Sequence, residues 1–455
     1  MPNLPPCPGP VRRRDFLQAG ALALGGLLLP DVFRARAASG TARADTAVIL
    51  LYLHGGPSQL ETYDLKPAAP TEYRSVFRPI ATAVPGMDIC ELFPLQARLA
   101  RRIALVRSVH HTMSSHTDGG IEVLTGKTPS RPDPTSTSRS EHPCLGAIAS
   151  KVRGFGPGGV PPYVAVPRQL YMVRPAYLGV QHGAFEAGDP SAPGYRLPGL
   201  ALPAGVDARR LDDRRSLRDR FDGLRRDLDV QGQLDGTDRF RRLAYQMLAS
   251  PQVTRAFDLG AEGDRLRDRY GRNIWGQGCL LARRLAEAGA AVITLFIDTP
   301  HSGPDFTNWD DHSGNAGRPG HFARYMERRL PYLDQALSAL IEDVYGRGLD
   351  ERILVVVMGE FGRTPRLSHN TTGTGRDHWP DAMTVLLSGG GLRTGQVVGA
   401  TNARAEYPTE RPYTPKDVLA TVYRHLGIDP RLSFPDTSGR PIPVLSEGAP
   451  IPDLV

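Results

Sequence analysis

Short, continuously apolar runs constrain this chain more than any other feature. Residues 47–53 (AVILLYL) lead directly into His54-Gly-Gly-Pro. Comparable runs occur later, at 103–109, 290–297, 353–358 and 383–387. Runs of this length without polar alternation are typical of parallel strands buried on both faces. Amphipathic helical stretches lie between them, notably 279–288 and 324–345, and we expect the second to bend or restart at Pro331. The alternation predicts an α/β fold with a mainly parallel central sheet covered on both faces.

The composition excludes several classes of protein. The chain has 455 residues, of which 40% are hydrophobic, so disorder, collagen and coiled coil are excluded. Its net charge is +7, from 55 Lys and Arg against 48 Asp and Glu. The densest charged stretch, 207–229, interleaves eight Arg with seven Asp, which is typical of a solvated helix face. No basic patch with interleaved aromatic residues occurs, so we expect no nucleic-acid partner.

The N-terminus reads as an export signal. Arg12-Arg13-Arg14-Asp15-Phe16-Leu17 is a twin-arginine pattern, followed by an apolar run at 19–30 that is too short to span a bilayer. Small-residue cleavage sites end at Ala37 or Ala44. We therefore expect residues 1–37 to be a twin-arginine signal, a periplasmic or otherwise exported location, and no stable membrane span after its removal. A short membrane anchor or a chance arginine cluster is the alternative.

The remaining chain is expected to form one domain. We place it at 45–445, with a loop-rich and helical elaboration at about 131–270, where Pro and Gly are frequent and then charged helical patterns follow. Cys90, Cys144 and Cys279 are scattered and form no CxxC pair. A disulfide scaffold and a thiolate zinc site are therefore both unsupported.

Histidines and acids gather where the predicted strands end. His54 follows the first run, and the later runs are followed by further candidates: His110, His111 and His116; Asp298, Asp310, Asp311 and His312; Glu360, Arg363, Asp377 and His378. Parallel strands bring their carboxyl ends to one edge of the sheet, where active sites of such folds lie. Neutral imidazole and carboxylate bind Zn, Mn and similar ions. The joint pattern predicts a metal or catalytic cluster at that edge, although each single histidine can equally be a hydrogen-bonded surface residue.

Two further groups allow two interpretations each. Ser58 and Glu61 match a capping box, which we favour over a serine nucleophile presented at a helix N-terminus. Arg363, Arg366 and Arg376 can hold an anionic group bidentately or can pair with acids on the surface.

Several segments resemble a bacterial family called domain of unknown function 1501. They are His54-Gly-Gly-Pro-Ser-Gln, Leu124-Thr-Gly-Lys-Thr-Pro, the stretch from Tyr270-Gly to Ala282-Arg-Arg-Leu-Ala-Glu-Ala-Gly, Trp309-Asp-Asp-His, Gly359-Glu-Phe-Gly-Arg-Thr-Pro and Gly375-Arg-Asp-His-Trp-Pro. The family is placed in the alkaline phosphatase and sulfatase superfamily. The resemblance implies a three-layer α/β/α sandwich that hydrolyses phosphate or sulfate esters at one or two metals. Fold alone does not establish the reaction.

The resemblance also suggests ligands. Asp310, His312 and His378 resemble the Asp, His and His of the first metal site of the superfamily. Glu360 stands where the superfamily has the Asp of an Asp-His pair, and Phe361 takes the place of that His. His54 stands where the first strand normally delivers an Asp ligand.

The nucleophile position departs from the pattern as well. Aligned through Leu124-Thr125-Gly126, the sulfatase motif places its nucleophile on His116, its Arg on Gly120 and its basic residue on Lys127. Three alternatives follow: His54, His116 and Glu360 rebuild a different metal site, His116 is itself nucleophile or general acid/base, or hydrolysis has been lost. Hydroxyl nucleophiles beside His116 also remain open, on Ser114, Ser115 or Thr117.

The sequence thus predicts an exported metal-dependent hydrolase of small phosphate or sulfate esters. The expected ligands of a divalent ion, Zn or Mn with Ca or Mg as alternatives, are Asp310, His312, His378, Glu360, His54 and His116. The expected catalytic groups are His116, His54 and Arg363, with nearby arginines on the anionic ester. The rival hypothesis is a non-catalytic binding or scaffold protein of the periplasm or cell surface on the same fold.

Overall fold

The computed structural model describes residues 45–156, 158–197, 247, 250–314 and 320–455. The predicted export signal at 1–37 lies outside the described residues, as does the part of the predicted elaboration at 198–246. The domain bounds of 45–445 and about 131–270 therefore stay predictions. None of the helices in the described ranges has the apolar length that crossing a bilayer requires.

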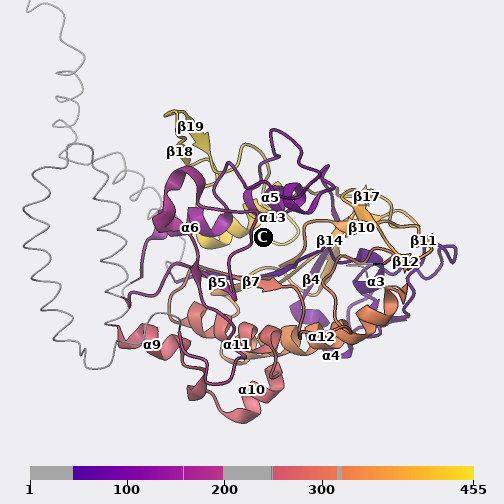
Figure 1. The fold of residues 1–455 in the computed structure, drawn as a ribbon, viewed down its shortest axis with the longest axis horizontal. Helices are drawn as coiled ribbons and strands as arrows, with labels where there is room; N and C mark the ends of the chain where they lie inside the picture. Colours follow the sequence, from indigo (N-terminus) through magenta and orange to yellow (C-terminus); the bar gives the residue numbers. More distant parts are fainter. Residues whose placement is uncertain (1–44, 157, 198–246, 248–249, 315–319) are drawn as a thin grey trace, which may run out of the picture. The chain divides into compact units, whose positions relative to one another are not determined.

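The central feature is an eight-stranded sheet (Figure 1). Its spatial order is β15 (Gln396–Val398), β4 (Ala104–Val109), β14 (Met383–Gly389), β9 (Ile353–Met358), β1 (Ala47–Leu53), β7 (Val292–Ile297), β5 (Tyr163–Val166), β6 (Phe185–Glu186). β1 lies between two parallel neighbours, with Leu50 opposite Thr294 of β7 and Val356 of β9. β14 runs antiparallel to both β4 and β9. The sheet is therefore mostly parallel, and the predicted mixed α/β class is confirmed.

Each face of the sheet has its own apolar core. Along β1, Ile49 and Leu51 belong to one core, whereas Val48 and Leu50 belong to the other. The first core includes side chains of α4 (Pro94–Arg98), α9 (Pro251–Phe257), α10 (Asp264–Tyr270), α11 (Ile274–Glu287) and α12 (Ala323–Gly346). The second includes side chains of α5 (His116–Thr125), α6 (Leu145–Arg153) and α13 (Pro415–Leu426). Figure 1 shows these two sets of helices on opposite sides of the strands.

Two helices differ from their predicted bounds. α11 begins earlier than expected because the side chain of Asn273 accepts the amides of Trp275 and Gly276, both at 3.0 Å, and so caps the helix. α12 is one helix of 24 residues with Pro331 inside it, so the expected restart is wrong. The flanking Leu330 and Leu333 are fully buried in the first core, and this packing offsets the hydrogen bond that proline removes.

The smaller elements connect and flank the sheet. They are α3 (Gln59–Thr62), β2 (Pro79–Ile80), β3 (Ile89–Cys90), β8 (Gly320–His321), β10 (Gly362–Arg363), β11 (Ser368–Asn370), β12 (Gly373–Gly375), β13 (His378–Trp379), β16 (Ala400–Thr401), β17 (Pro408–Glu410), β18 (Ser433–Pro435) and β19 (Pro441–Pro443), with 3-10 turns at Ala100–Arg102, Ala176–Leu178, Val180–His182 and Leu259–Ala261. The antiparallel pairing of β10 with β13 sets Arg363 opposite His378.

The loop that carries Asp310 lies directly against the end of β1. The amide of Trp309 donates to the carbonyl of His54 at 3.0 Å. Gly55 has a φ of +118°, and a Cβ there would lie 2.3 Å from the backbone nitrogen of Asp310. Only glycine therefore permits this approach, which brings the loop after β7 to the carboxyl end of β1.

Candidate metal centre

Asp310 lies at the centre of the polar groups that the loops bring together. Its Oδ1 is 3.0 Å from Nε2 of His312, 3.1 Å from Nε2 of His378 and 2.5 Å from Nη2 of Arg363. Its Oδ2 is 3.3 Å from Nε2 of His116. Burial by itself raises the pKa of Asp310, but hydrogen bonds from the three histidines and the charge of Arg363 outweigh it and hold the pKa well below its usual range. The carboxylate is therefore ionised.

The three histidines around Asp310 are oriented in the same way. In each, Nδ1 lies within hydrogen-bond distance of an oxygen atom: Asp377 Oδ1 at 2.6 Å for His312, the Ser114 carbonyl at 2.6 Å for His378 and Glu360 Oε1 at 2.7 Å for His116. Because these oxygens accept, Nδ1 is the donor on that side of each ring, and Nε2 is the atom that faces Asp310 and can hold either a second proton or a metal ion. Ligating histidines in metalloproteins are anchored in this manner.

The three Nε2 atoms all lie next to the Asp310 carboxylate, those of His312 and His378 at Oδ1 and that of His116 at Oδ2. Those of His312 and His378 are only 2.9 Å apart, beside the Asp310 carboxylate. Lone pairs and a negative charge at this separation repel one another unless a proton or a cation lies between them. Ligand atoms of His116, Asp310 and His378 all lie within 4.8 Å of one another. The donor set of imidazole nitrogens and one carboxylate fits a divalent transition metal.

His116 is the first residue of α5 and is held from two sides. The preceding Ser115 caps the helix, its hydroxyl accepting the amide of Asp118 at 3.2 Å. Burial lowers the pKa of His116, but hydrogen bonds to Asp310 and Glu360 outweigh this and raise it to about 9. Without a metal, His116 therefore holds a second proton, for which a metal ion competes.

Glu360 and His54 lie beside this cluster, behind His116. Glu360 is fully buried, and its Oε1 accepts the amide of Gly55 at 2.8 Å as well as His116. Its Oε2 is buried without a hydrogen-bond partner among the described residues. His54 places Nδ1 at 3.3 Å from Asp298 Oδ1, its Nε2 is likewise unpartnered, and its ring centroid is 5.8 Å from that of His116. Glu360 and His54 thus lie beside the predicted site. The Nε2 atoms that face Asp310 are those of His116, His312 and His378.

Two of the three expected arginines, Arg363 and Arg376, are buried and bonded within the protein. Arg363 is completely buried; its Nε donates to the carbonyl of Gly56 and its Nη1 to that of Arg376, both at 3.0 Å, and its Nη2 to Gly55 and Asp310. Arg376 is equally buried and pairs with Glu61 at 2.9 Å. Donors committed in this way cannot receive an anionic ester, so the structure gives Arg363 the role of holding Asp310.

Neither interpretation of Ser58 matches its surroundings. Ser58 is fully buried, and its hydroxyl donates to the carboxylate of Glu61 rather than accepting a backbone amide. The following helix, α3, has four residues and no side-chain cap. Ser58 therefore fixes Glu61, which in turn fixes Arg376, and it faces neither a substrate nor the metal centre.

A buried ion pair supports the loop beneath Asp310. Asp311 and Arg329 of α12 are 1% and 0% exposed and bonded to each other. Arg329 also donates to the Thr307 hydroxyl at 3.1 Å and the Asn308 carbonyl at 2.9 Å, and its guanidinium lies 4.6 Å from the centre of the Trp309 ring. This single side chain therefore organises the loop that presents Asp310 and His312.

Phe361 forms an apolar wall where the superfamily pattern has a histidine. It is fully buried, and its ring centroid lies 4.4 Å from that of His378 and 5.4 Å from that of His116. The Phe361 ring packs against both imidazoles and so limits how far they can rotate.

Sequence reasoning named the clustered groups, and Asp298 and Asp377 beside them, but it did not predict which groups act as supports. Asp377, Asp298 and the Ser114 carbonyl orient the imidazoles, and Arg329 orients the loop. Asp377 and Asp298 had a detectable signal, since one precedes His378 directly and the other ends the β7 run. Arg329 lies on a charged helix and had none.

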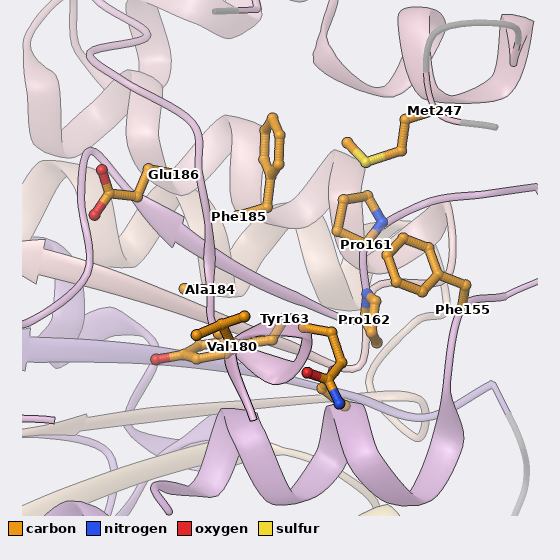
Figure 2. Close-up of a pocket in the computed structure, with 12 residues that line it drawn as sticks. Phe155, Pro161, Pro162, Tyr163, Val180, Ala184, Phe185, Glu186 and Met247 are labelled. Carbon is orange, nitrogen blue, oxygen red and sulfur yellow. The ribbon is translucent and has the colours of Figure 1, made fainter. Parts of the chain in front are cut away.

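The structure also contains a cavity of about 200 Å³, away from the cluster (Figure 2). It lies between α6 and the β5–β6 edge of the sheet and is lined mainly by apolar side chains, among them Phe155, Pro161, Phe185 and Met247. None of the residues around Asp310 lines it. The cavity and the polar cluster are therefore separate features.

Comparison with solved structures finds distant similarity. The chain is similar to a sulfatase from Pseudoalteromonas sp. (12% identity, 92% of this chain and 72% of that chain, TM-score 0.39) and to a putative sulfatase from Bacteroides thetaiotaomicron (11%, 90% and 74%, TM-score 0.40). It is also similar to the phosphonate monoester hydrolase of Silicibacter pomeroyi (11%, 85% and 74%, TM-score 0.38). Similarity of this degree does not extend the activities of those proteins to this chain.

The sequence comparisons are clearer. No protein with a curated description matches the chain. A family model matches residues 45–455, which is most of the chain. The chain belongs to the family described as "Protein of unknown function (DUF1501)".

Proposed function

We propose that this protein is an exported metal-dependent hydrolase of phosphate or sulfate esters, built as an alkaline phosphatase-like three-layer sandwich. The observation that carries the proposal is the convergence of three Nε2 atoms, each on a ring anchored through Nδ1, upon the ionised carboxylate of Asp310. The sequence resemblance to the phosphatase and sulfatase superfamily supports the choice of reaction.

His116, His312, His378 and Asp310 would hold the ion. Three imidazoles favour Zn or Mn, because Ca and Mg prefer all-oxygen sites. A divalent ion held there would supply a positive charge to polarise an oxygen of the ester. Arg363 and Asp377 keep the ligands in position, Arg363 through Asp310 and Asp377 through His312.

His54 is the candidate for proton transfer. Its Nδ1 lies beside Asp298, and its buried Nε2 has no hydrogen-bond partner among the described residues, so Nε2 is the ring atom that would accept a proton from a nucleophile or return one to a leaving alcohol. Phe361 excludes water from one side of the cluster.

A second candidate function is binding without turnover. The observation that favours it is the burial of Arg363 and Arg376, which leaves neither of these predicted arginines available to an anionic ester. A scaffold or binding protein would keep the metal for structure and would show no hydrolysis.

Metal analysis joined to an ester screen tests the proposal. The protein, exported in a native host, is assayed by mass spectrometry for metal and with nitrophenyl phosphate monoesters, diesters and sulfates. We expect bound Zn or Mn and turnover, both lost in Asp310→Asn and His378→Ala and both retained in the exposed control Asp429→Asn. Bound metal without turnover on any ester favours the scaffold function, and absence of both metal and turnover contradicts the proposal.

A further inference from the structure

An exposed tyrosine borders the candidate site. Tyr171 is 40% exposed, one of three large hydrophobic side chains in the described part of the chain with exposure this high. It follows β5, whose carboxyl end faces the same edge as those of β1 and β7. Its ring packs edge-on against His54, with centroids 5.7 Å apart and an interplanar angle of 85°. An aromatic surface left open beside polar, ionisable groups is a feature of ligand-binding sites.

A cation is connected to the same histidine through one aromatic ring. The guanidinium of Arg168 is 5.2 Å from the centre of the Phe296 ring, which packs against His54 with centroids 5.0 Å apart. Arg168 is exposed and makes no hydrogen bond or ion pair with another described side chain, unlike the buried Arg363. Its donors therefore remain available to a ligand.

A carboxylate completes this rim. Asp298 is 39% exposed, and only its Oδ1 faces His54, at 3.3 Å. The rim, which we define as Tyr171, Arg168 and Asp298, thus combines an aromatic surface and a hydrogen-bond acceptor beside His54 with a hydrogen-bond donor beyond Phe296.

This combination discriminates among classes of ligand. A ligand with several negative charges is repelled by the carboxylates of Asp298, Glu360 and Asp310. An alkyl chain leaves Arg168 and Asp298 without hydrogen bonds, which costs binding energy when they are covered. A polyhydroxylated ring satisfies all three groups, because its hydroxyls both donate and accept while its CH groups pack on the tyrosine.

We propose that Tyr171, Arg168 and Asp298 form a subsite for a neutral sugar ring, which is the alcohol part of the ester. The identification of the ring as part of an ester rests on the proposed function. The subsite itself requires only that a sugar bind at the rim, with its ring on Tyr171 and its hydroxyls on Arg168 and Asp298.

Direct binding tests the subsite without any reaction. Methyl glycosides of glucose, galactose, mannose and N-acetylglucosamine are added at millimolar concentration to the full chain, and saturation-transfer NMR reports contact. We expect at least one glycoside to bind, with affinity about tenfold lower in Tyr171→Ala and in Arg168→Ala. Tyr171→Phe should retain binding, since it keeps the ring.

Matched controls separate the subsite from general surface effects. Val180→Ala removes an exposed apolar side chain near the distant cavity, and Arg431→Ala removes an exposed arginine at the β18 end; neither should change glycoside binding. Thermal unfolding checks that every variant is folded. No binding of any glycoside, or equal binding by Tyr171→Ala, overturns the subsite.

A comparison of two esters separates this inference from the proposed function. Turnover of glucose 6-phosphate and 6-sulfate is compared with that of ethyl phosphate and ethyl sulfate in the same variant. We expect the ratio of kcat/KM between ring-bearing and ringless ester to fall about tenfold in Tyr171→Ala and to stay constant in Val180→Ala. Turnover with an unchanged ratio overturns the subsite and leaves the hydrolase standing, whereas glycoside binding without turnover of any ester does the reverse.

Discussion

Asp310 and Asp311 are neighbours in one loop, yet they face two different regions of the molecule. Asp311 points into the supporting layer, where it is bonded to Arg329 and both side chains are almost completely buried. Asp310 points to the cluster of histidines and is about one-fifth exposed, at 21%. The two carboxylates therefore have the same chemistry but opposite surroundings.

The two carboxylates differ in whether their partners can exchange a proton for a metal ion. Asp311 faces the permanent charge of Arg329, whereas Asp310 faces, in addition to the permanent charge of Arg363, imidazole nitrogens that bind either a proton or a metal. Burial raises the pKa of Asp311, against the effect of Arg329. In Asp310 the same burial is outweighed, and its pKa is lowered. Asp311, the supporting carboxylate, is thus fixed by one permanent charge. Asp310, the candidate ligand, is surrounded by imidazoles whose protons a metal ion can displace.

The largest effect should come from breaking the support. Arg329→Met leaves Asp311 as an uncompensated buried charge, and we expect the free energy of unfolding to fall by about 3–5 kcal/mol. Chemical denaturation of the metal-free protein measures this loss. The double variant Arg329→Met, Asp311→Leu should recover most of it, because no charge is then left unpaired. A loss below about 1 kcal/mol in the single variant would show that the pair does not hold the loop.

Two histidines near the cluster should respond to pH in opposite directions. His111 is buried and neutral, with Nε2 2.7 Å from the carbonyl of Glu360 and Nδ1 accepting the amide of Met113 at 3.2 Å. Burial lowers its pKa from 6.5 to about 4. Between these values only the unfolded chain binds the proton, so stability falls as pH falls, by about 3 kcal/mol.

His116 should give the reverse dependence in the metal-free protein. Its folded pKa of about 9 exceeds the unfolded value of 6.5, so its contribution is present below pH 6.5 and is lost as pH rises through 9. Denaturation across pH in His111→Asn and His116→Asn measures each contribution. The first variant should flatten the acid side and the second the alkaline side. An acid slope that His111→Asn leaves unchanged would contradict the assignment.

A smaller effect should come from loosening one imidazole. Asp377→Asn weakens the hydrogen bond that fixes Nδ1 of His312, and we expect affinity for Zn to fall about 10–100-fold. Calorimetric titration of the metal-free protein provides the measurement. The free energy of unfolding without metal should change little, in contrast to Arg329→Met, because Asp377 is half exposed. Unaltered affinity would mean that the ring is held by packing alone.

Much of the fold followed from the apolar runs. The predicted strands at 47–53 and 353–358 coincide with β1 and β9. A strand that is buried on both faces is apolar at every position, so the change from apolar to polar residues marks its ends. The direction of β14 could not be predicted, since an apolar run reads the same whichever way it pairs.

The sequence predicted which residues gather at the site, but it did not predict what each of them does there. Parallel strand ends bring His116, Asp310 and His378 to one edge, and this follows from topology. Which imidazole nitrogen faces inward depends on acceptors such as the Ser114 carbonyl, a backbone atom without a sequence signal. The burial of Arg363 depends on carbonyls of Gly55 and Gly56, which any residue type supplies.

Calorimetric titration of Zn into the metal-free protein, wild type beside Asp310→Asn, tests the central claim most directly. We predict one tight site per chain in the wild type, with release of protons on binding because His116 must lose its second proton. Asp310→Asn should lose that tight site while its free energy of unfolding falls less than that of Arg329→Met. Equal Zn binding by both proteins, or no tight site in either, would contradict the assignment of Asp310 and its histidines as a metal centre.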